Sequence, residues 1–363
     1  MSFGLDNLPY GSVLTDDGRR VAAVRYGDAV LDLARVDPAL FAAGDLDAFL
    51  AAGPGAWARV RHDARAVLAA GTVELIPLDR VRPVLPFTVA DYVDFYASEH
   101  HATNAGRIFR PQGDPLPANW KHLPVGYHGR SSSVVVSDTP IERPAGIVAP
   151  GAYGPTERLD FEAEVAFVVG RPGRRIPVTA ADEHVFGLCL LNDWSARDVQ
   201  AFETVPLGPF LGKSFATSVA AWITPLAALV GARRPAPPQD PPPLPHLAGG
   251  TALDLELEVR INDVVVSRPP FAGTYWTYAQ MLAHLTGNGA AVRPGDVFAS
   301  GTVSGPEPGQ RGCLLELTVN GTEPLDVGGE RRTWLRDGDT VTISGRAGDI
   351  DLGEVSGRIV PAG

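Results

Sequence analysis

Leu159-Asp-Phe-Glu-Ala-Glu-Val-Ala-Phe167 alternates at a period of two: apolar residues fill the odd positions, and the first three even positions are acidic. Successive side chains of a β-strand point to opposite faces, so this stretch predicts a strand with one apolar and one acidic face. Same-face side chains lie about 6.5–7 Å apart, so Glu162 and Glu164 can converge on one cation. A hard divalent cation prefers carboxylate oxygens on a rigid element. The stretch therefore predicts both β-structure and a metal site.

Further strand patterns flank this stretch and are separated by Gly, Pro and Asp turns. We expect strands at residues 134–136, 185–191, 253–266, 297–300, 314–319 and 340–344. Helices are predicted only near residues 196–204 and 277–285. Residues 233–250 contain seven prolines and are predicted as an irregular surface loop. Residues 89–363 are thus predicted to form a mostly-β (α+β) domain with a few peripheral helices.

Residues 1–88 differ in character and are predicted as a separate small domain, because 363 residues exceed what one hydrophobic core normally covers. A hairpin is expected around Gly27, and helices at residues 40–50 and 57–70. Prolines within residues 77–86 mark a linker. This domain has no clustered carboxylates and no Gly-rich loop, so we expect it to serve folding or assembly.

Composition excludes several classes of function. The net charge of −11 argues against nucleic acid or an anionic membrane as a partner. No apolar run is long enough to span a bilayer, and the N-terminus lacks the basic flank and apolar core of a signal peptide. The two cysteines, Cys189 and Cys313, are too few for a disulfide framework. A cytoplasmic protein is therefore expected.

Spacing alone does not single out the acidic stretch at residues 159–167. Leu253-Asp-Leu-Glu-Leu-Glu-Val259 repeats its alternation, with Glu256 and Glu258 in the equivalent places. Either stretch can be an amphipathic strand whose acidic face is solvated. A choice between them needs other residues.

Two more segments carry candidate chemistry. In Leu190-Leu-Asn-Asp-Trp-Ser-Ala-Arg-Asp-Val-Gln200 an apolar run ends at Asp193, and Ser195 with Asp198 is predicted to form a capping box that opens a helix. Arg197 and Gln200 would then share one helical face. The alternative is that Asp193 merely caps the helix and Arg197 pairs with a surface acid.

The other segment is Asp91-Tyr-Val-Asp-Phe-Tyr-Ala-Ser-Glu-His-His-Ala-Thr-Asn104, which places Asp94 close to two histidines and two tyrosines. In isolation, His101 can equally be an exposed or structurally satisfied histidine. The Cys and His spacing typical of zinc sites is missing from the sequence, so we expect oxygen ligands.

Taken together, these segments resemble the fumarylacetoacetase family. Further matching motifs are Asn119-Trp-Lys-His-Leu-Pro-Val-Gly-Tyr-His-Gly-Arg130, Val205-Pro-Leu-Gly-Pro-Phe-Leu-Gly-Lys-Ser214, Arg293-Pro-Gly-Asp296, Ala299-Ser-Gly-Thr302 and Leu314-Leu-Glu316. They run in order through residues 91–363, and Asn7-Leu-Pro-Tyr-Gly11 extends the resemblance to the N-terminus. The resemblance implies an SH3-like β-barrel at residues 1–88, a β-roll domain at residues 89–363 that carries the site, and a homodimer.

Residue by residue, the resemblance also implies roles. The four carboxylates that match ligands of a divalent cation, Mg²⁺ or Ca²⁺, are Asp94, Glu162, Glu164 and Asp193, which favours the strand at residues 159–167. His101 matches the general base and Glu316 the acid that orients it. The residues that match polar groups around the reacting carbonyl and leaving group are Arg197, Gln200 and Lys213. Substrate-contacting positions are matched by Tyr96, Arg110, Tyr127 and Thr302.

The implied function is a metal-dependent hydrolase that cleaves a carbon–carbon bond of a 1,3-diketone acid, namely 4-fumarylacetoacetate, in the last step of tyrosine and phenylalanine breakdown. One departure bears on the substrate: Thr204 stands where the family usually has a substrate-contacting tyrosine. An acylpyruvate hydrolase or an oxo-acid decarboxylase is therefore an alternative. A catalytically silent β-rich binding protein is another.

Overall fold

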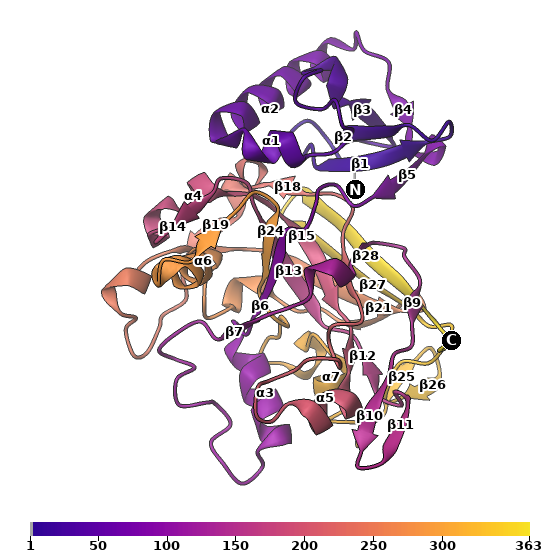
Figure 1. Ribbon diagram of the computed structural model, residues 1–363, viewed down its shortest axis with the longest axis vertical. Helices are drawn as coiled ribbons and strands as arrows, with labels where there is room; N and C mark the ends of the chain where they lie inside the picture. Colours follow the sequence, from indigo (N-terminus) through magenta and orange to yellow (C-terminus); the bar gives the residue numbers. More distant parts are fainter. Residues whose placement is uncertain (1–2) are drawn as a thin grey trace.

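The computed structural model describes residues 3–363 (Figure 1). Its N-terminal unit is a five-stranded sheet of order β4-β3-β2-β1-β5, covered by two helices. The elements are β1 (Tyr10–Thr15), β2 (Arg20–Tyr26), β3 (Ala29–Asp32), α1 (Asp47–Ala51), α2 (Gly53–Ala70), β4 (Ile76–Pro77) and β5 (Val81–Val84). The expected hairpin is confirmed as β2–β3. The helix expected at residues 40–50 begins only at Asp47, after Gly44 turns the chain with a φ of +73°.

A larger sheet, of order β7-β6-β24-β13-β15-β17-β8, forms the centre of the molecule, and β18 extends it beside β15. Its strands are β6 (Asp91–Phe95), β7 (Gly126–His128), β8 (Val134–Val136), β13 (Ala163–Val169), β15 (Val185–Asp193), β17 (Thr217–Val219), β18 (Thr224–Pro225) and β24 (Asp296–Ala299). Strands β13 and β15 are antiparallel, with Glu164 opposite Leu191. Every residue of these two strands is buried, and their largely apolar sequences contain only three strongly polar residues, Glu164, Asn192 and Asp193.

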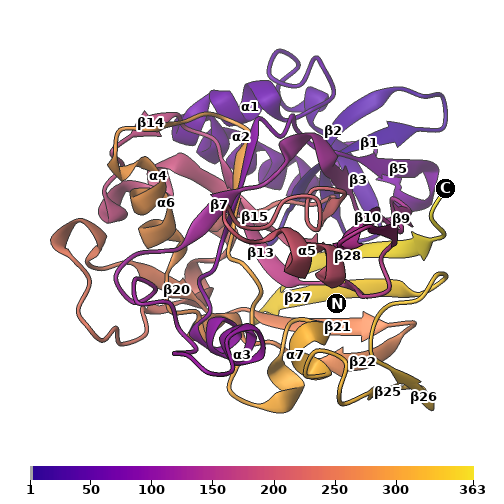
Figure 2. The ribbon, with the colours of Figure 1, turned by 60° about the horizontal axis from the view of Figure 1, so that its bottom comes forward.

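A second sheet, of order β22-β21-β27-β28-β9, packs against the first. Its strands are β9 (Ile141–Glu142), β21 (Glu256–Ile261), β22 (Val264–Ser267), β27 (Thr340–Ala347) and β28 (Ile350–Val360) (Figure 2). The single strand expected at residues 253–266 is divided, because Asn262 and Asp263 both adopt positive φ and turn the chain between β21 and β22.

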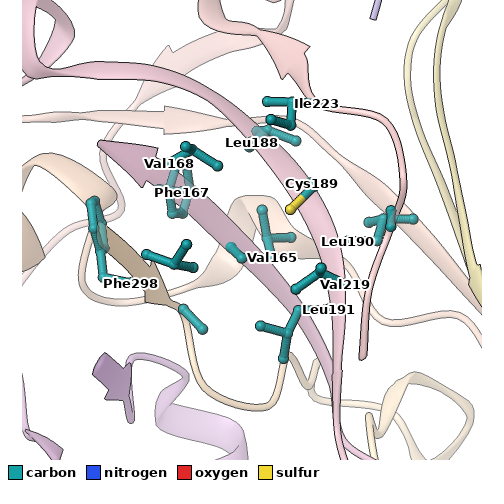
Figure 3. Packing of buried hydrophobic residues seen from close by; sticks show 14 of the residues in the cluster. Val165, Phe167, Val168, Leu188, Cys189, Leu190, Leu191, Val219, Ile223 and Phe298 are labelled. Carbon is teal, nitrogen blue, oxygen red and sulfur yellow. The ribbon is translucent and has the colours of Figure 1, made fainter. Parts of the chain in front are cut away.

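The core forms where the sheets and the N-terminal unit meet. Figure 3 shows Val165 and Phe167 of β13 packed among side chains of β15 and β24. The Phe167 ring stacks on Phe298 with ring centroids 5.3 Å apart. Tyr10 of β1 stacks on Phe49 and meets the edge of Phe186 of β15, each at 5.2 Å. The two units therefore share one apolar core, and the division at residues 88 and 89 stays a prediction.

Three of the five helices of the larger unit were not predicted by the sequence patterns. The helices are α3 (Glu99–Phe109), α4 (Ala181–His184), α5 (Arg197–Glu203), α6 (Tyr278–Gly287) and α7 (Leu314–Leu317). The three that were not predicted are α3, α4 and α7. Within residues 314–319, expected as a strand, residues 314–317 form α7 instead. The Asp160 carboxylate accepts hydrogen bonds from the backbone N–H groups of Leu314 and Leu315, at 2.7 and 2.9 Å, and so satisfies the first turn of this helix. Helix α3 begins where the Ser98 side chain accepts from His101 N.

Two smaller expectations are also wrong. Helix α5 has Ala196 at its N-cap without a side-chain cap, because Asp198 accepts from Thr156 instead and Ser195 donates to Asp193 O. Residues 233–250 are not wholly irregular, since β19 (Arg233–Pro235) pairs with β20 (Thr251–Leu253). The remaining strands are β10 (Ala145–Ala149), β11 (Ala152–Pro155), β12 (Leu159–Asp160), β14 (Gly173–Arg174), β16 (Ser195–Ala196), β23 (Ala291–Val292), β25 (Leu325–Val327) and β26 (Glu330–Arg332).

The architecture confirms a mostly-β fold with peripheral helices. Helices α3, α5 and α7 gather at the end of the central sheet that lies away from the N-terminal unit (Figure 1). Across residues 3–363, none of the helices combines the length and apolar character needed to cross a membrane.

Candidate active site

Four carboxylates from separate parts of the chain meet beside this end of the central sheet. Asp94 comes from β6, Glu164 from β13 and Asp193 from the last position of β15, while Glu162 lies just before β13. One oxygen from each lies within 4.8 Å of the others, and all four side chains are buried. The expectation that Asp193 ends a strand is confirmed. Glu256, in contrast, is exposed on β21 and pairs with arginine.

The unsatisfied oxygens in this cluster indicate what it can hold. Both oxygens of Glu164 and Oδ1 of Asp94 are buried without a hydrogen-bond partner among the described residues. A buried acceptor that lacks a partner is costly, so such atoms call for a ligand. A spread of 4.8 Å is close to twice the ~2.0–2.6 Å that separates Mg²⁺ or Ca²⁺ from its oxygen ligands. The four side chains therefore fit a divalent cation.

Burial and mutual repulsion set the charge of the cluster. Burial, together with the neighbouring carboxylates, raises the pKa of Asp94 and of Glu164 well above the ordinary range. Burial also raises the pKa of Asp193, to about 6, although Lys213 opposes the shift. Burial would raise the pKa of Glu162 as well, but Lys213 and Arg197 outweigh it and lower that pKa. A bound cation would relieve the repulsion between carboxylates that helps to raise these pKa values.

Two buried cations border the cluster. Lys213 Nζ donates to Glu162 Oε2 and to Asp193 Oδ2, each at 2.5 Å. Arg197 Nη2 lies 2.7 Å from Glu162 Oε1, and its Nε donates to Asp160 Oδ2 at 2.8 Å. Arg197 therefore pairs with buried acids, and the surface-acid alternative is wrong. The fixed positive charges offset part of the charge that four carboxylates bring together.

A histidine–glutamate pair adjoins the cluster. His101 Nδ1 on α3 lies 2.6 Å from Glu316 Oε1 on α7. Asn104 Nδ2 and Ser304 Oγ donate to the same carboxylate at 2.8 and 2.7 Å. Burial would raise the pKa of Glu316, but His101 and these donors lower it to about 2. With Nδ1 held by Glu316, Nε2 of His101 is the ring nitrogen left to exchange a proton.

The predicted substrate-contacting residues lie at different depths. Tyr127 of β7 stands opposite Asp94 in the sheet register, and the Tyr96 ring meets the His101 ring edge-on at 5.2 Å. Thr302 is buried, and its hydroxyl has no partner among residues 3–363. The other two are less buried than Thr302: Arg110 is exposed and donates to Pro115 O, and Thr204 is half-buried at the C-cap of α5.

A cavity of ≈280 Å³ opens beside the cluster. Asp193 and Lys213 form part of its wall, with Tyr92, Tyr127 and Thr217. Gln200 does not line this cavity; its Oε1 accepts from Arg197 Nη1 at 3.1 Å and thereby helps to hold the guanidinium. The arrangement combines an anionic cluster, two fixed cations, a paired histidine and room for a small polar molecule.

The sequence patterns missed three residues that support the site. Asp160 joins Arg197 to the start of α7, and Asn104 and Ser304 satisfy the Glu316 carboxylate. Asn104 follows His101 by three positions and therefore lies on the same face of α3. A predicted helix at these residues would have placed Asn104 beside the histidine. No local pattern around Ser304 indicated its role, because the contact bridges segments that only the fold brings together.

Comparisons with known proteins agree with this site. The family model described as fumarylacetoacetate (FAA) hydrolase C-terminal matches residues 91–360, and the one described as fumarylacetoacetase N-terminal matches residues 6–86. The chain is 43% identical to the fumarylacetoacetase of Arabidopsis thaliana and 42% identical to that of Homo sapiens. Each alignment spans 404 residues and covers 99% of this chain and 96% of the relative.

A solved structure gives the same picture of the fold. The fumarylacetoacetate hydrolase from the psychrophilic Exiguobacterium antarcticum superposes with a TM-score of 0.62 at 20% identity. The superposition covers 98% of this chain and 99% of that one. At this identity the likeness concerns the fold alone. From the two matching models and the full-length relatives, we conclude that the chain belongs to the fumarylacetoacetase family.

Proposed function

We propose that this protein hydrolyses 4-fumarylacetoacetate to fumarate and acetoacetate with the help of one divalent cation. The observation that carries the proposal is the convergence of four buried carboxylates beside a His101–Glu316 pair at 2.6 Å. Family membership supports the substrate, since the relatives named above are fumarylacetoacetases over nearly their whole length.

We infer that Asp94, Glu162, Glu164 and Asp193 hold the cation, which is Mg²⁺ or Ca²⁺. Both ions prefer several anionic oxygen ligands, and both accept further oxygens beyond four carboxylates. When bound, the cation would stabilise negative charge that develops on the diketone oxygens. The unpartnered oxygens of Glu164 and Asp94 support the assignment.

His101 is the proposed general base. Its Nε2 takes a proton from water while the water oxygen forms a bond to the ketone carbon on the fumaryl side. Glu316 holds the Nδ1–H and stabilises the imidazolium that results. When the carbon–carbon bond breaks, His101 gives this proton to the departing acetoacetate carbon. The histidine is then neutral again.

Arg197 and Lys213 are proposed to stabilise the negative charge of the reacting carbonyl and of the acetoacetate enolate. Both are buried and already held by carboxylates, so little reorganisation is needed when charge develops. Gln200 assists by fixing Arg197. These fixed cations also make the anionic cluster tolerant of an anionic substrate.

The proposed contacts to the substrate come from the surrounding side chains Tyr96, Arg110, Tyr127, Thr204 and Thr302. Thr302 is buried, Tyr96 and Tyr127 are half-buried, and the exposed Arg110 is proposed to meet a carboxylate of the substrate at the rim. Thr204 offers a hydroxyl without an aromatic ring, which leaves more space at the end of α5.

Turnover with the purified protein tests the proposal. Loss of diketone absorbance should accompany formation of fumarate and acetoacetate, should stop when EDTA removes the cation, and should return with Mg²⁺ or Ca²⁺. A short acylpyruvate should react much more slowly. Faster turnover of the acylpyruvate would move the substrate assignment to that class, and full activity in EDTA would rule out the cation.

Three wider expectations complete the proposal: a homodimer, a cytoplasmic location, and a role in the last step of tyrosine and phenylalanine breakdown. They rest on the resemblance to the family. Sedimentation of the purified protein tests the dimer directly, since a monomer at micromolar concentration would contradict it.

A further inference from the structure

The buried hydroxyl of Tyr92 lacks a partner among the described residues, and Tyr92 lines the same cavity as Asp193 of the carboxylate cluster. Tyr92 is 2% exposed, and its hydroxyl makes no hydrogen bond to any residue from 3 to 363. Tyrosine hydroxyls in protein interiors normally find an acceptor, so this one calls for an explanation. The proposed reaction scheme gives Tyr92 no role.

The strand geometry explains why Tyr92 lies there. Tyr92 and Asp94 are two positions apart on β6, so their side chains leave the same face of the strand. The Tyr92 ring also lines the cavity that Asp193 and Lys213 border. A phenol is protonated at neutral pH, so the Tyr92 hydroxyl can donate a hydrogen bond.

The ring itself is held firmly. The backbone carbonyl of Tyr92 accepts from Gly129 N at 2.9 Å. A Cβ placed on Gly129 would lie only 2.3 Å from Tyr92 Cδ1, so the ring packs directly against that glycine. The hydroxyl therefore has a fixed position, and a phenylalanine can occupy the same space.

We infer that Tyr92 is a positioning residue whose hydroxyl donates a hydrogen bond to the oxygen shell of the divalent cation. The inference rests on the proposed function, because it needs the cation between the four carboxylates. Mg²⁺ and Ca²⁺ both take more than four oxygen ligands, so water or substrate oxygens complete the shell. A fixed donor next to such an oxygen orients it and strengthens the binding of the metal.

The chain provides a matched control. Tyr10 is also fully buried, and its hydroxyl also has no partner among the described residues. Its ring lies between Phe49 and Phe186 in the core shared with the N-terminal unit, away from the carboxylates. Tyr92→Phe and Tyr10→Phe thus remove the same atom from two buried settings, of which only one adjoins the proposed cation.

The test is a calorimetric titration of EDTA-stripped protein with Mg²⁺ and with Ca²⁺, combined with thermal melting of the metal-free forms. Tyr92→Phe should raise the Kd for the cation about tenfold, the lower end of the loss usual when a group behind a metal ligand is removed. Tyr10→Phe should leave the Kd unchanged. Both metal-free variants should melt at or above the wild-type temperature, because each loses a hydroxyl that has no partner.

The outcomes separate this inference from the proposed function. A wild-type Kd for Tyr92→Phe would overturn the role of Tyr92 and leave the cation site intact. A lower melting temperature for metal-free Tyr92→Phe would also overturn it, by showing that the hydroxyl is bonded within the protein. A wild-type protein that binds neither ion would overturn the cation site, and this inference with it.

Discussion

Removal of the Glu316 carboxylate is expected to lower both the stability of the fold and the rate of turnover. Glu316→Gln keeps the size of the side chain but removes its charge. The pKa of Glu316 lies at about 2, compared with an ordinary value of 4.5. At about 1.4 kcal/mol for each pH unit, this displacement stabilises the folded protein by about 3 kcal/mol.

The direction of the Glu316 pKa shift determines the pH range in which this carboxylate stabilises the fold. Because the folded pKa lies below the unfolded one, the stabilisation is complete above about pH 4.5 and is lost as the pH falls towards 2. We therefore expect Glu316→Gln to lose about 3 kcal/mol of unfolding free energy at neutral pH. The difference in unfolding free energy between the variant and the wild type should become smaller below pH 4.5. A glutamine amide would also point a donor at the donors Asn104 and Ser304, which adds to the loss.

Urea unfolding followed by tryptophan fluorescence measures this loss, and turnover measures the second effect. Without Glu316 the His101 ring is neither oriented nor stabilised when protonated, so we expect turnover to fall ~10²–10⁴-fold. The exposed Glu323, changed to Gln, is the matched control and should alter neither quantity. If Glu316→Gln were as stable as the wild type at neutral pH, or if the difference in stability stayed unchanged down to about pH 3, the Glu316 charge would not stabilise the fold.

Three further predictions concern the cation. Glu164→Gln should abolish stoichiometric Mg²⁺ or Ca²⁺ in the purified protein, and Glu256→Gln should leave it unchanged. Metal analysis that gives the reverse would place the cation at β21 instead of β13. Lys213→Met should destabilise the metal-free protein by ~3–5 kcal/mol, because it leaves buried carboxylates unpaired, and saturating Mg²⁺ should restore part of the loss in thermal melts. Since the pKa of Asp193 is raised to about 6, protons compete for the site, so calorimetry should show cation affinity rising with pH through 6 and proton release on binding; pH-independent affinity would contradict this.

Strong local patterns predicted most of the fold from sequence. The apolar run that ends at Asp193 became β15 of the central sheet. The alternation at residues 159–167 was divided: its part from Ala163 became β13 of the same sheet, and Leu159–Asp160 became β12, which pairs with β16. Where prediction failed, contacts from distant residues decided the structure. Residues 314–317 have the composition of a strand, yet Asp160, more than 150 positions away, holds the first N–H groups of α7.

In the candidate site, too, local patterns predicted some features, and others depended on contacts between distant parts of the chain. The alternation placed Glu162 and Glu164 on one face, but it could not distinguish them from Glu256 and Glu258, since the spacing is identical. Burial distinguishes them: Glu162 and Glu164 are buried at the start of β13, whereas Glu256 and Glu258 lie on β21 of the second sheet, where Arg346 and Arg268 compensate their charge. Burial depends on the pairing of the strands with their neighbours, which is a property of the whole chain.

Diffraction from a crystal soaked in Mn²⁺ shows whether the four carboxylates hold one cation, because Mn²⁺ prefers the same oxygen ligands as Mg²⁺ and Ca²⁺ and scatters anomalously. We expect one strong anomalous peak within coordination distance of Asp94, Glu162, Glu164 and Asp193. Crystals that diffract well and carry manganese elsewhere, with those four side chains empty, would contradict it.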